Sequence, residues 1–235
     1  MECIFVSELS FNSTKFIIPT VEAKHLKALR IKQNEQILIT NGKSLSAIAI
    51  VERISKNDYK ANIKEFFENY GELNYSLSLA IGIIDSQPRF EFAIEKCIEL
   101  GVSEIFPLIL DYSQQKKISQ ERLTAKAIAT IKQCKRSKLP TIHFPQTVNQ
   151  LLEKISNSTK KYQLILTDEN GTTPSDFFNE NHNGNHNTII FVGGEGGFSE
   201  RELLLFPHHT VKWNLGNRRL RAETAAIVSI GILTS

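Results

Sequence analysis

One stretch near the C-terminus restricts the possible folds most strongly. Five apolar or β-branched residues, 188–192, run directly into two glycine pairs that flank Glu195. Ser199 follows the loop, and Glu202 comes three residues later, which is the spacing of a capping box. This order predicts a β-strand, a glycine loop and the start of a helix.

The glycine loop also indicates a binding function. Glycine is needed where the backbone takes a positive φ, or where a ligand contacts bare main chain. A tight turn is the simpler alternative, and a single glycine pair would favour it. A second glycine turn at Gly216, with three arginines close behind it, makes a ligand-binding loop the better interpretation.

Length and composition are those of an ordinary globular protein. The chain has 235 residues, of which 41% are hydrophobic and 23% charged, enough for one large domain or for a small and a medium one. It has no apolar run of the roughly 18 residues that a membrane span needs, and no leader peptide, so we expect a cytoplasmic protein without a membrane partner. Cys3, Cys97 and Cys134 are odd in number and widely spaced, which argues against disulfides and for a reducing compartment.

Positive charge is concentrated in one segment. Residues 112–140 contain eight basic residues against one acid, Glu121, although the whole chain carries a net charge of only +3. A basic face of this kind is typical of binding to a phosphate backbone. A solvated, lysine-rich helix face explains the charge equally well, so charge alone leaves both interpretations open.

The first 70 residues are rich in predicted strands. Residues 36–40 and 45–54 form two strands around an Asn-Gly hairpin signal, and residues 59–67 form a third. A short helix is predicted at residues 21–29, with Thr20 as its N-cap. We therefore expect a small β-barrel-like module with one helix, which ends in the polar stretch 68–74.

Strands and helices alternate in the rest of the chain. Predicted strands cover residues 76–84, 105–110, 141–144, 164–167 and 189–192. Predicted helices cover residues 89–100, 119–136 and 148–155, the first ending at Gly101 and the second before Pro140. Alternation of this kind predicts a parallel sheet that binds ligands beyond the carboxyl ends of its strands, where the glycine loop lies.

The last helix, predicted at residues 222–233, is apolar on nearly all sides. Such a helix must be buried, either inside its own domain or against a second copy of the chain. We therefore expect a homodimer.

Several common kinds of site are disfavoured. A Walker P-loop needs Lys and Ser or Thr after its last glycine, but Phe198 follows Gly197; a dinucleotide fingerprint needs a third glycine where Ser199 stands. No credible Ser-His-Asp spacing or carboxylate cluster for a metal is visible. His182 and His186 lie four residues apart, but in an Asn- and Gly-rich loop, so we predict no metal site.

Two segments together resemble the paired signature of a known family. Residues 191–200 read Phe-Val-Gly-Gly-Glu-Gly-Gly-Phe-Ser-Glu, and residues 215–225 read Leu-Gly-Asn-Arg-Arg-Leu-Arg-Ala-Glu-Thr-Ala. Both resemble the RsmE family of 16S rRNA uridine N3-methyltransferases, which belongs to the SPOUT superfamily. The resemblance covers nearly the whole chain: residues 25–30, 95–102 and 133–140 resemble the family's His-x-x-x-Leu-Arg, Lys-x-x-Glu-Leu-Gly-Val and Gln-x-x-Arg-x-x-x-Pro segments. This chain departs from the family pattern at Gly193, where many members have proline, and at Arg219, where an aliphatic residue is usual.

The resemblance implies an α/β fold in two domains. Residues 1–70 would form a PUA-like, RNA-binding β-barrel, and residues 74–235 a SPOUT methyltransferase domain with a deep trefoil knot at about 164–235. It also implies a homodimer that binds S-adenosyl-L-methionine in each knot and methylates N3 of one uridine of 16S rRNA, uridine 1498 in standard rRNA numbering, within the small ribosomal subunit. Two alternatives remain: a SPOUT methyltransferase for another rRNA or tRNA site, and a non-catalytic RNA-binding protein.

The resemblance also implies roles for particular residues. The cofactor would lie against three loops that contain Leu166, Thr167, Val192, Gly193, Gly194, Glu195, Gly196, Gly197, Leu215, Gly216 and Leu220. Arg221 and Glu223 are the catalytic candidates. Arg221 would stabilise the developing uracil anion or place an RNA phosphate, whereas Glu223, like Glu195, is interpreted as a base or, preferably, a structural acceptor. RNA would contact Lys27, Arg30, Lys132, Lys135, Arg136 and Lys138.

Overall fold

The computed structural model describes residues 1–55, 57–114, 117–175 and 187–234. The chain forms two compact units, Met1–Glu72 with Ile128–Leu139, and Leu73–Ala127 with Pro140–Ser235. None of the described helices is long and apolar enough to cross a membrane.

The first unit takes in a segment that we expected in the second. Ser137 follows the basic helix, and its backbone N–H donates to the carbonyl of Tyr70 at 2.9 Å while its own carbonyl accepts from Ser44 N at 3.0 Å. Arg136, buried beside it, forms an ion pair with Glu72. These partners are far apart in the sequence, so no local pattern indicates that they meet.

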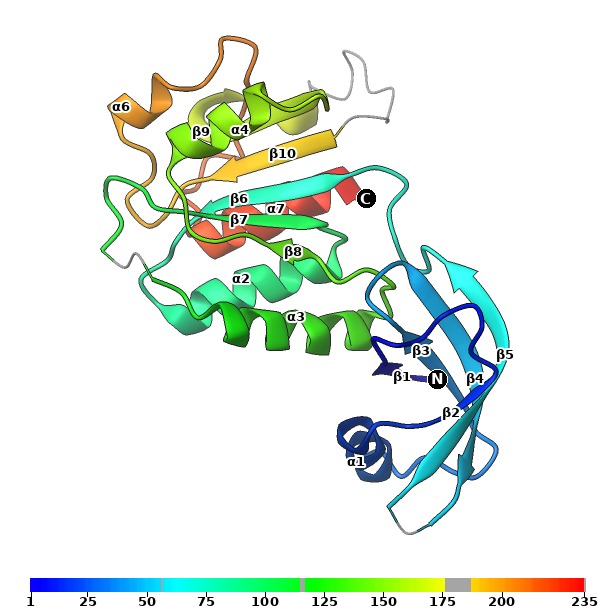
Figure 1. Ribbon diagram of the computed structural model, residues 1–235. Helices are drawn as coiled ribbons and strands as arrows, with labels where there is room; N and C mark the ends of the chain where they lie inside the picture. The colour runs from blue at the N-terminus through cyan, green and yellow to red at the C-terminus, as the bar shows by residue number, and fades with distance from the viewer. Residues whose placement is uncertain (56, 115–116, 176–186, 235) are drawn as a thin grey trace. The chain divides into compact units, whose positions relative to one another are not determined.

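Five strands and one helix make up the N-terminal part of this unit (Figure 1). The elements are β1 (Glu2–Phe5), β2 (Lys15–Ile17), α1 (Thr20–Ala28), β3 (Gln36–Thr40), β4 (Leu45–Arg53) and β5 (Tyr59–Glu68). The strands pair in the order β1-β3-β4-β5-β2, and only the β1–β3 pairing among them is parallel. The predicted small β-rich module with one helix is therefore confirmed.

The hairpin between β3 and β4 forms where its sequence signal predicted it. Gly42 has a φ of +71°, a value that L side chains rarely adopt. The Asn41 side-chain oxygen accepts from the backbone N–H groups of Lys43, at 2.7 Å, and Leu45, at 3.2 Å. The turn is thus stabilised by its own residues, as its composition predicts.

The predicted N-cap of α1 is wrong by one residue. The helix begins at Thr20, and Pro19 occupies the cap position with a φ of −53° and an extended ψ of 143°. No side chain accepts a hydrogen bond at this end. Because proline already has the backbone angle that the position needs, the chain enters the helix without Thr20 acting as a cap. Leu26 of α1 packs into the core with Ile4, Ile37 and Ala47.

The second unit is built on a six-stranded sheet. Its elements are β6 (Leu77–Gly82), α2 (Gln87–Glu99), β7 (Glu104–Leu108), β8 (Thr141–Ile142), α4 (Val148–Ser156), β9 (Tyr162–Thr172), β10 (Asn187–Val192), α6 (Glu200–Leu203), β11 (Val211–Trp213) and α7 (Ala222–Thr234). The first turns of α3 (Gln120–Cys134) also belong to it. The strand order is β11-β9-β10-β6-β7-β8, and neighbouring strands of this sheet pair in parallel.

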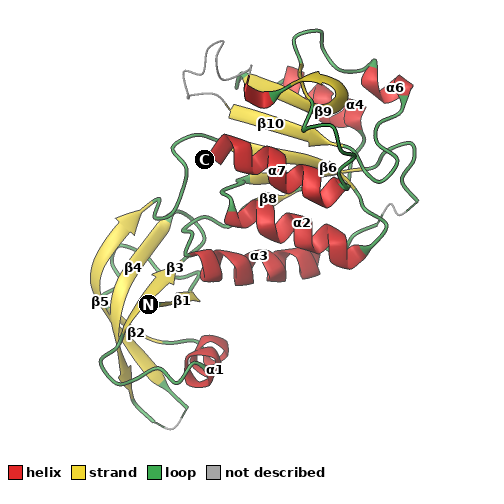
Figure 2. Cartoon of the chain, turned by 180° about the vertical axis from the view of Figure 1, so that it is seen from behind, coloured by secondary structure: helices red, strands yellow, loops and turns green. Residues whose placement is uncertain are grey.

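Helices cover both faces of this sheet, as the alternation predicted. α4 lies on the face seen in Figure 1, and α2 and α7 lie on the face seen in Figure 2. Alternate residues along a strand point to opposite faces of the sheet, and on the face covered by α4 the strand residues Ala80, Leu166 and Phe191 pack with Leu151 of α4. β6, in the middle of the sheet, is buried along its whole length.

The order of the strands determines where a ligand can approach. β6 is followed in space by β7 and β8 on one side, and the chain returns to form β10 and β9 on the other. The carboxyl ends of β6 and β10 therefore meet at a switch point, which is where open parallel sheets bind ligands. Gly82 ends β6, and Gly193 follows directly after β10.

Candidate active site

The glycine loop and the end of β6 lie so close to their neighbours that a side chain would not fit at Gly82 or Gly196. A Cβ on Gly82 would lie 2.4 Å from the backbone N of Gly194, and one on Gly196 would lie 2.7 Å from Cβ of Tyr112. Gly197 has a φ of +72°, and its N–H donates to the Gly194 carbonyl at 3.1 Å. The loop is thus a tight turn pressed against the end of β6.

The predicted capping box at the end of the loop is confirmed. Ser199 Oγ accepts from Glu202 N at 3.2 Å, and Glu202 Oε2 accepts from Ser199 N at 2.8 Å. Asp111 extends this network, because it accepts from Ser199 Oγ at 2.5 Å and pairs with Arg201. These contacts anchor the end of the loop to the segment after β7.

The second glycine turn is held by one asparagine. Asn214 Oδ1 accepts from Gly216 N at 2.8 Å, and Asn214 Nδ2 donates to the Glu169 carbonyl at 2.7 Å. Gly216 itself has a φ of +114°. The turn that leads to α7 is therefore tied to the segment at the end of β9.

Both glycine turns border a pocket of about 1020 Å³ in the second unit. Three segments form most of its lining, residues 167–170, 192–198 and 213–222, together with Arg89, Leu203 and Ala225. The lining includes ten of the eleven predicted cofactor-binding residues: Thr167, Val192, Gly193, Gly194, Glu195, Gly196, Gly197, Leu215, Gly216 and Leu220. Leu166, the other one, is fully buried in the sheet core. The volume is at the upper end of the range found for small-molecule pockets.

Arg89 is a pocket residue that the sequence did not reveal. It lies in the first turn of α2, and its Nε and Nη2 donate to the two carboxylate oxygens of Glu223 at 2.8 and 2.7 Å. Its Nη1 donates to Glu195 Oε1 at 2.5 Å. One guanidinium thereby links α2, the glycine loop and the first turn of α7, which are widely separated along the chain. We call this set of three side chains the Arg89 clamp.

The Arg89 clamp favours the ionised form of the Glu223 carboxyl group. Hydrogen bonds from Arg89 hold the pKa of the Glu223 carboxyl below its ordinary value, against the opposing effect of burial. Glu223, one of the two catalytic candidates, is not among the residues that line the pocket. A carboxylate with a lowered pKa and two bonds to one guanidinium is a weak base, so the geometry favours the structural role for Glu223.

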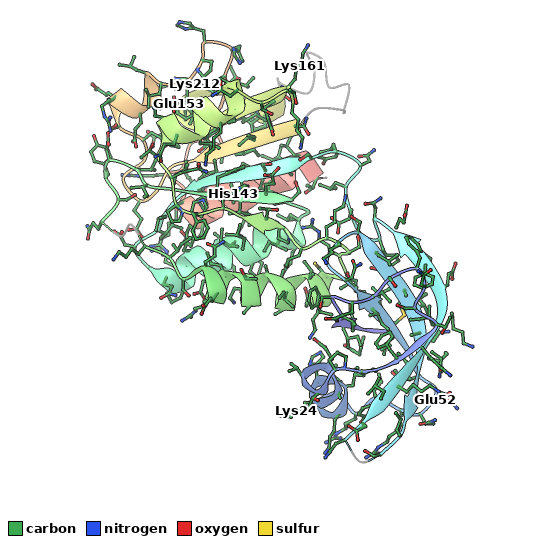
Figure 3. The ribbon with its side chains drawn as sticks, viewed as in Figure 1. Lys24, Glu52, His143, Glu153, Lys161 and Lys212 are labelled. Carbon is green, nitrogen blue, oxygen red and sulfur yellow. The ribbon has the colours of Figure 1, made fainter. Side chains whose placement is uncertain are left out.

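A second ion pair lies at the edge of the same pocket. Lys212 of β11 donates to Asp168 at 2.9 Å, and Figure 3 labels Lys212 on this part of the sheet. Burial opposes ionisation of Asp168, but hydrogen bonds from Asn170 N and Lys212 outweigh it and lower the pKa of Asp168 below its ordinary value. Asp168 is therefore a neutralised anion and not a free base.

Arg221, the other catalytic candidate, is exposed and lines the pocket. Arg218 and Arg219, which precede it in the turn, are also exposed and also line the pocket. The departure from the family pattern at Arg219 therefore adds a positive charge to the pocket surface and does not disturb the core.

The residues predicted to bind RNA lie in the first unit, and they differ in availability. Lys27 and Arg30 are exposed; Lys27 donates to Asn57 at 2.8 Å. Lys132 forms an ion pair with Glu22 at 2.9 Å, and its side chain is only 16% exposed. Lys135 and Lys138 are half-buried.

The prediction that Arg136 contacts RNA is wrong. Its side chain is 2% exposed, and its Nη2 donates to Glu72 Oε2 at 2.7 Å. The other oxygen of Glu72 accepts from the backbone N of Lys138 at 2.7 Å. The position of Arg136 in a charged segment predicts the same role as that of its basic neighbours, but the ion pair with Glu72, which is distant in sequence, places it in the interior.

No group of three or more residues able to hold a metal ion is present in the described part of the chain. His182 and His186, for which we predicted no metal, lie outside the described residues.

Comparison with known proteins identifies the family. An RNA methyltransferase domain matches residues 71–234, and an RNA methyltransferase PUA domain matches residues 20–64. The ribosomal RNA small subunit methyltransferase E of Rickettsia conorii is 32% identical over 211 residues, which cover 86% of this chain and 81% of that protein. The protein of the same name from Mesomycoplasma hyopneumoniae is 31% identical over 233 residues, covering 95% of this chain and 94% of that one.

Solved structures agree with this result. A methyltransferase structure from Legionella pneumophila, in complex with the cofactor SAM, is 28% identical, with a TM-score of 0.79 and coverage of 98% of this chain and 96% of that one. The ribosomal RNA small subunit methyltransferase E of Neisseria gonorrhoeae, bound to S-adenosyl methionine, has the same fold, with a TM-score of 0.81 at 23% identity and coverage of 98% and 95%. The chain belongs to the RNA methyltransferase family that includes the ribosomal RNA small subunit methyltransferase E proteins.

Proposed function

We propose that this protein uses S-adenosylmethionine to methylate N3 of one uridine of 16S rRNA, the uridine numbered 1498 in standard rRNA numbering. The observation that carries the proposal is the pocket of about 1020 Å³ between two glycine turns at the carboxyl ends of parallel strands, in a chain of this family. The curated relatives named above support the small-subunit rRNA as the substrate. The choice of uridine rests on the family resemblance.

The pocket residues fit a nucleoside cofactor. A Cβ on Gly197 or Gly216 would meet no atom of the described residues within 4 Å, apart from its own chain neighbours, so at these glycines the backbone borders open space that a ligand can occupy. Both glycine turns, with Trp213 and Leu220 as apolar lining, border the space proposed for the adenine and ribose. The Legionella relative, with its bound SAM, supports the same cofactor here.

The protein's part in the reaction is mainly to position the reactants and to stabilise charge. The bound cofactor supplies an electrophilic methyl group on a sulfonium, and the attacking uracil nitrogen must be in line with it. Arg221 faces the pocket as a permanently charged guanidinium, and we assign it the stabilisation of the negative charge that develops on the uracil ring. Glu223 and Glu195 hold the pocket wall through Arg89.

The first unit is proposed to bind rRNA. The PUA match supports this role, and Lys27 and Arg30 present exposed charge on α1 and directly after it. Phosphate contacts of this kind add affinity without reading sequence. Because Arg136 is buried, Lys135 and Lys138 are the RNA contacts that we propose from the loop after α3. Lys132 is also a proposed contact, although its charge is partly neutralised by its ion pair.

We further propose that two copies associate through α7, and that the protein works in the cytoplasm, where rRNA is its substrate. Val228 is 37% exposed, and Ile227, Ile232 and Leu233 are only half-buried, so an apolar face of α7 is left uncovered in the single chain. Sedimentation of a stable monomer at micromolar concentration would contradict the dimer. The trefoil knot expected over about residues 164–235 stays a prediction.

Two experiments test the function. Calorimetry with S-adenosylmethionine should show one site per chain, and Arg221→Ala should keep cofactor binding but lose turnover on rRNA. Mapping of N3-methyluridine in rRNA from a strain that lacks the gene should show the modification missing, and the wild-type gene should restore it. If the modification persists without the gene, the proposed function is wrong; if Arg221→Ala turns over normally, only the role of Arg221 is wrong.

A further inference from the structure

The charges around the pocket are unevenly neutralised. Arg89 is paired with Glu195 and Glu223, and Asp168 is paired with Lys212. In the described part of the chain, no hydrogen bond or ion pair involves the side chains of Arg218 or Arg219. Arg221 is influenced through space by Glu223, whose carboxylate is already occupied by Arg89. Among the described residues, the three exposed guanidiniums on the pocket surface therefore have no carboxylate that forms an ion pair with them.

The turn that carries these arginines is fixed at both ends. Asn214 ties its beginning to Gly216 and to the Glu169 carbonyl. At its end, the Arg221 carbonyl accepts from Ala225 N at 2.8 Å, in the first turn of α7. Placing three like charges within four residues costs electrostatic energy and gains no contact inside the protein. A fixed cationic segment of this kind lowers the entropic cost of binding an anion.

The proposed cofactor does not account for this charge. S-adenosylmethionine carries a cationic sulfonium and an ammonium against a single carboxylate, so its net charge is positive. Its carboxylate can occupy one guanidinium, and its remaining charge is repelled by the others. An anion from the second substrate, the RNA, is needed to balance the positive charge of these arginines.

We propose that Arg218 and Arg219 form, beside Arg221, a phosphodiester-binding rim, which holds the sugar-phosphate backbone of the RNA next to the nucleotide to be methylated. The inference rests on the proposed function and adds to it a second place where RNA is held, in the second unit. A guanidinium offers paired donors that match two phosphate oxygens, which suits it to a phosphodiester better than a lysine. Arg219 gives this protein a phosphate contact in addition to that of Arg218.

Salt dependence tests the rim directly. Arg219→Gln and the double variant Arg218→Gln with Arg219→Gln remove charge at exposed positions, so folding should be kept; thermal unfolding verifies this. Binding of the full-length protein to unmodified 16S rRNA transcript is measured across a series of KCl concentrations. Each lost phosphate contact should make the slope of log K against log salt shallower by about 0.7 for single-stranded RNA. The double variant should show about twice that change and should bind the transcript about tenfold more weakly near 0.15 M salt.

Lys161→Gln is the matched control. Lys161 is exposed and immediately precedes β9, whereas the pocket is at the carboxyl end of that strand. This variant should leave the salt slope unchanged. Cofactor affinity, measured by calorimetry, should stay within about twofold of wild type in the double arginine variant, because the rim is assigned to RNA.

The possible outcomes separate the rim from the function itself. An unchanged slope in the double variant, or an equal change in Lys161→Gln, would overturn the rim. A loss of cofactor affinity as large as the loss of RNA affinity would also overturn it, because the arginines would then hold the cofactor carboxylate. A wild-type protein that neither binds S-adenosylmethionine nor methylates the transcript would instead reject the proposed function.

Discussion

Replacing Arg89 with methionine should loosen the glycine loop and weaken cofactor binding. Methionine keeps the length of the side chain on α2 but removes all three hydrogen bonds of the Arg89 clamp. Glu195 is then released between flexible glycines, and Glu223, with a side chain that is 12% exposed, loses its cationic partner. The loop must therefore be ordered again each time the cofactor binds.

The size of the effect follows from the number of residues that are freed. Fixing the backbone of one residue costs roughly 1–2 kcal/mol, and the clamp fixes at least Glu195 directly. Because a factor of ten in affinity corresponds to about 1.4 kcal/mol, the dissociation constant for S-adenosylmethionine should rise about 5- to 30-fold. Arg89→Lys should give a smaller rise, since one ammonium cannot reproduce the bidentate contact with Glu223.

Calorimetry gives the dissociation constant, and hydrogen exchange of residues 193–198 reports the order of the loop. Both should change together in Arg89→Met. Arg122→Met is the control: Arg122 also pairs with a glutamate on α2, at 2.5 Å from Glu91, but does not line the pocket. It should leave cofactor affinity and loop exchange as in the wild type. Wild-type affinity and unchanged loop exchange in Arg89→Met would refute the reasoning.

Substitutions at Gly197 and Arg136 and a change of pH probe the backbone, the buried ion pair and the pKa values. Gly197→Val, at a φ of +72°, should weaken cofactor binding at least tenfold in calorimetry, and Gly197→Asn less, because asparagine tolerates this conformation; equal effects would contradict the backbone argument. Arg136→Met should lower the free energy of unfolding in urea by about 3–5 kcal/mol, because it leaves the carboxylate of Glu72 buried without its partner, and adding Glu72→Met should recover part of that loss. The lowered pKa values of Glu223 and Asp168 stabilise the fold above the unfolded values of about 4, so the unfolding free energy should be flat from about pH 7 to 5.5 and fall below about pH 4.5; a fall that begins near neutral pH would contradict this assignment.

Much of the local structure could be predicted because its causes are close together in the sequence. The Asn41–Gly42 hairpin and the Ser199–Glu202 capping box each need only neighbouring residues, and both form as expected. The alternation of strands and helices predicted a parallel sheet with helices on both faces, because parallel strands are joined by crossover helices that pack on the faces of the sheet. The glycine loop showed where a ligand could approach the main chain, and its residues line the pocket.

The tertiary structure decided which charged residues face solvent and which are paired. Arg89 had no local signal for its role, because its partners Glu195 and Glu223 are brought to it only when the sheet and α7 assemble. Arg136 lies among lysines in the sequence, yet its ion pair with Glu72 holds it in the interior. Charge and periodicity in a sequence indicate which side chains favour exposure to water. The energy of an ion pair, however, depends on the distance between its two charged groups, and for residues far apart in the sequence only the folded chain sets that distance.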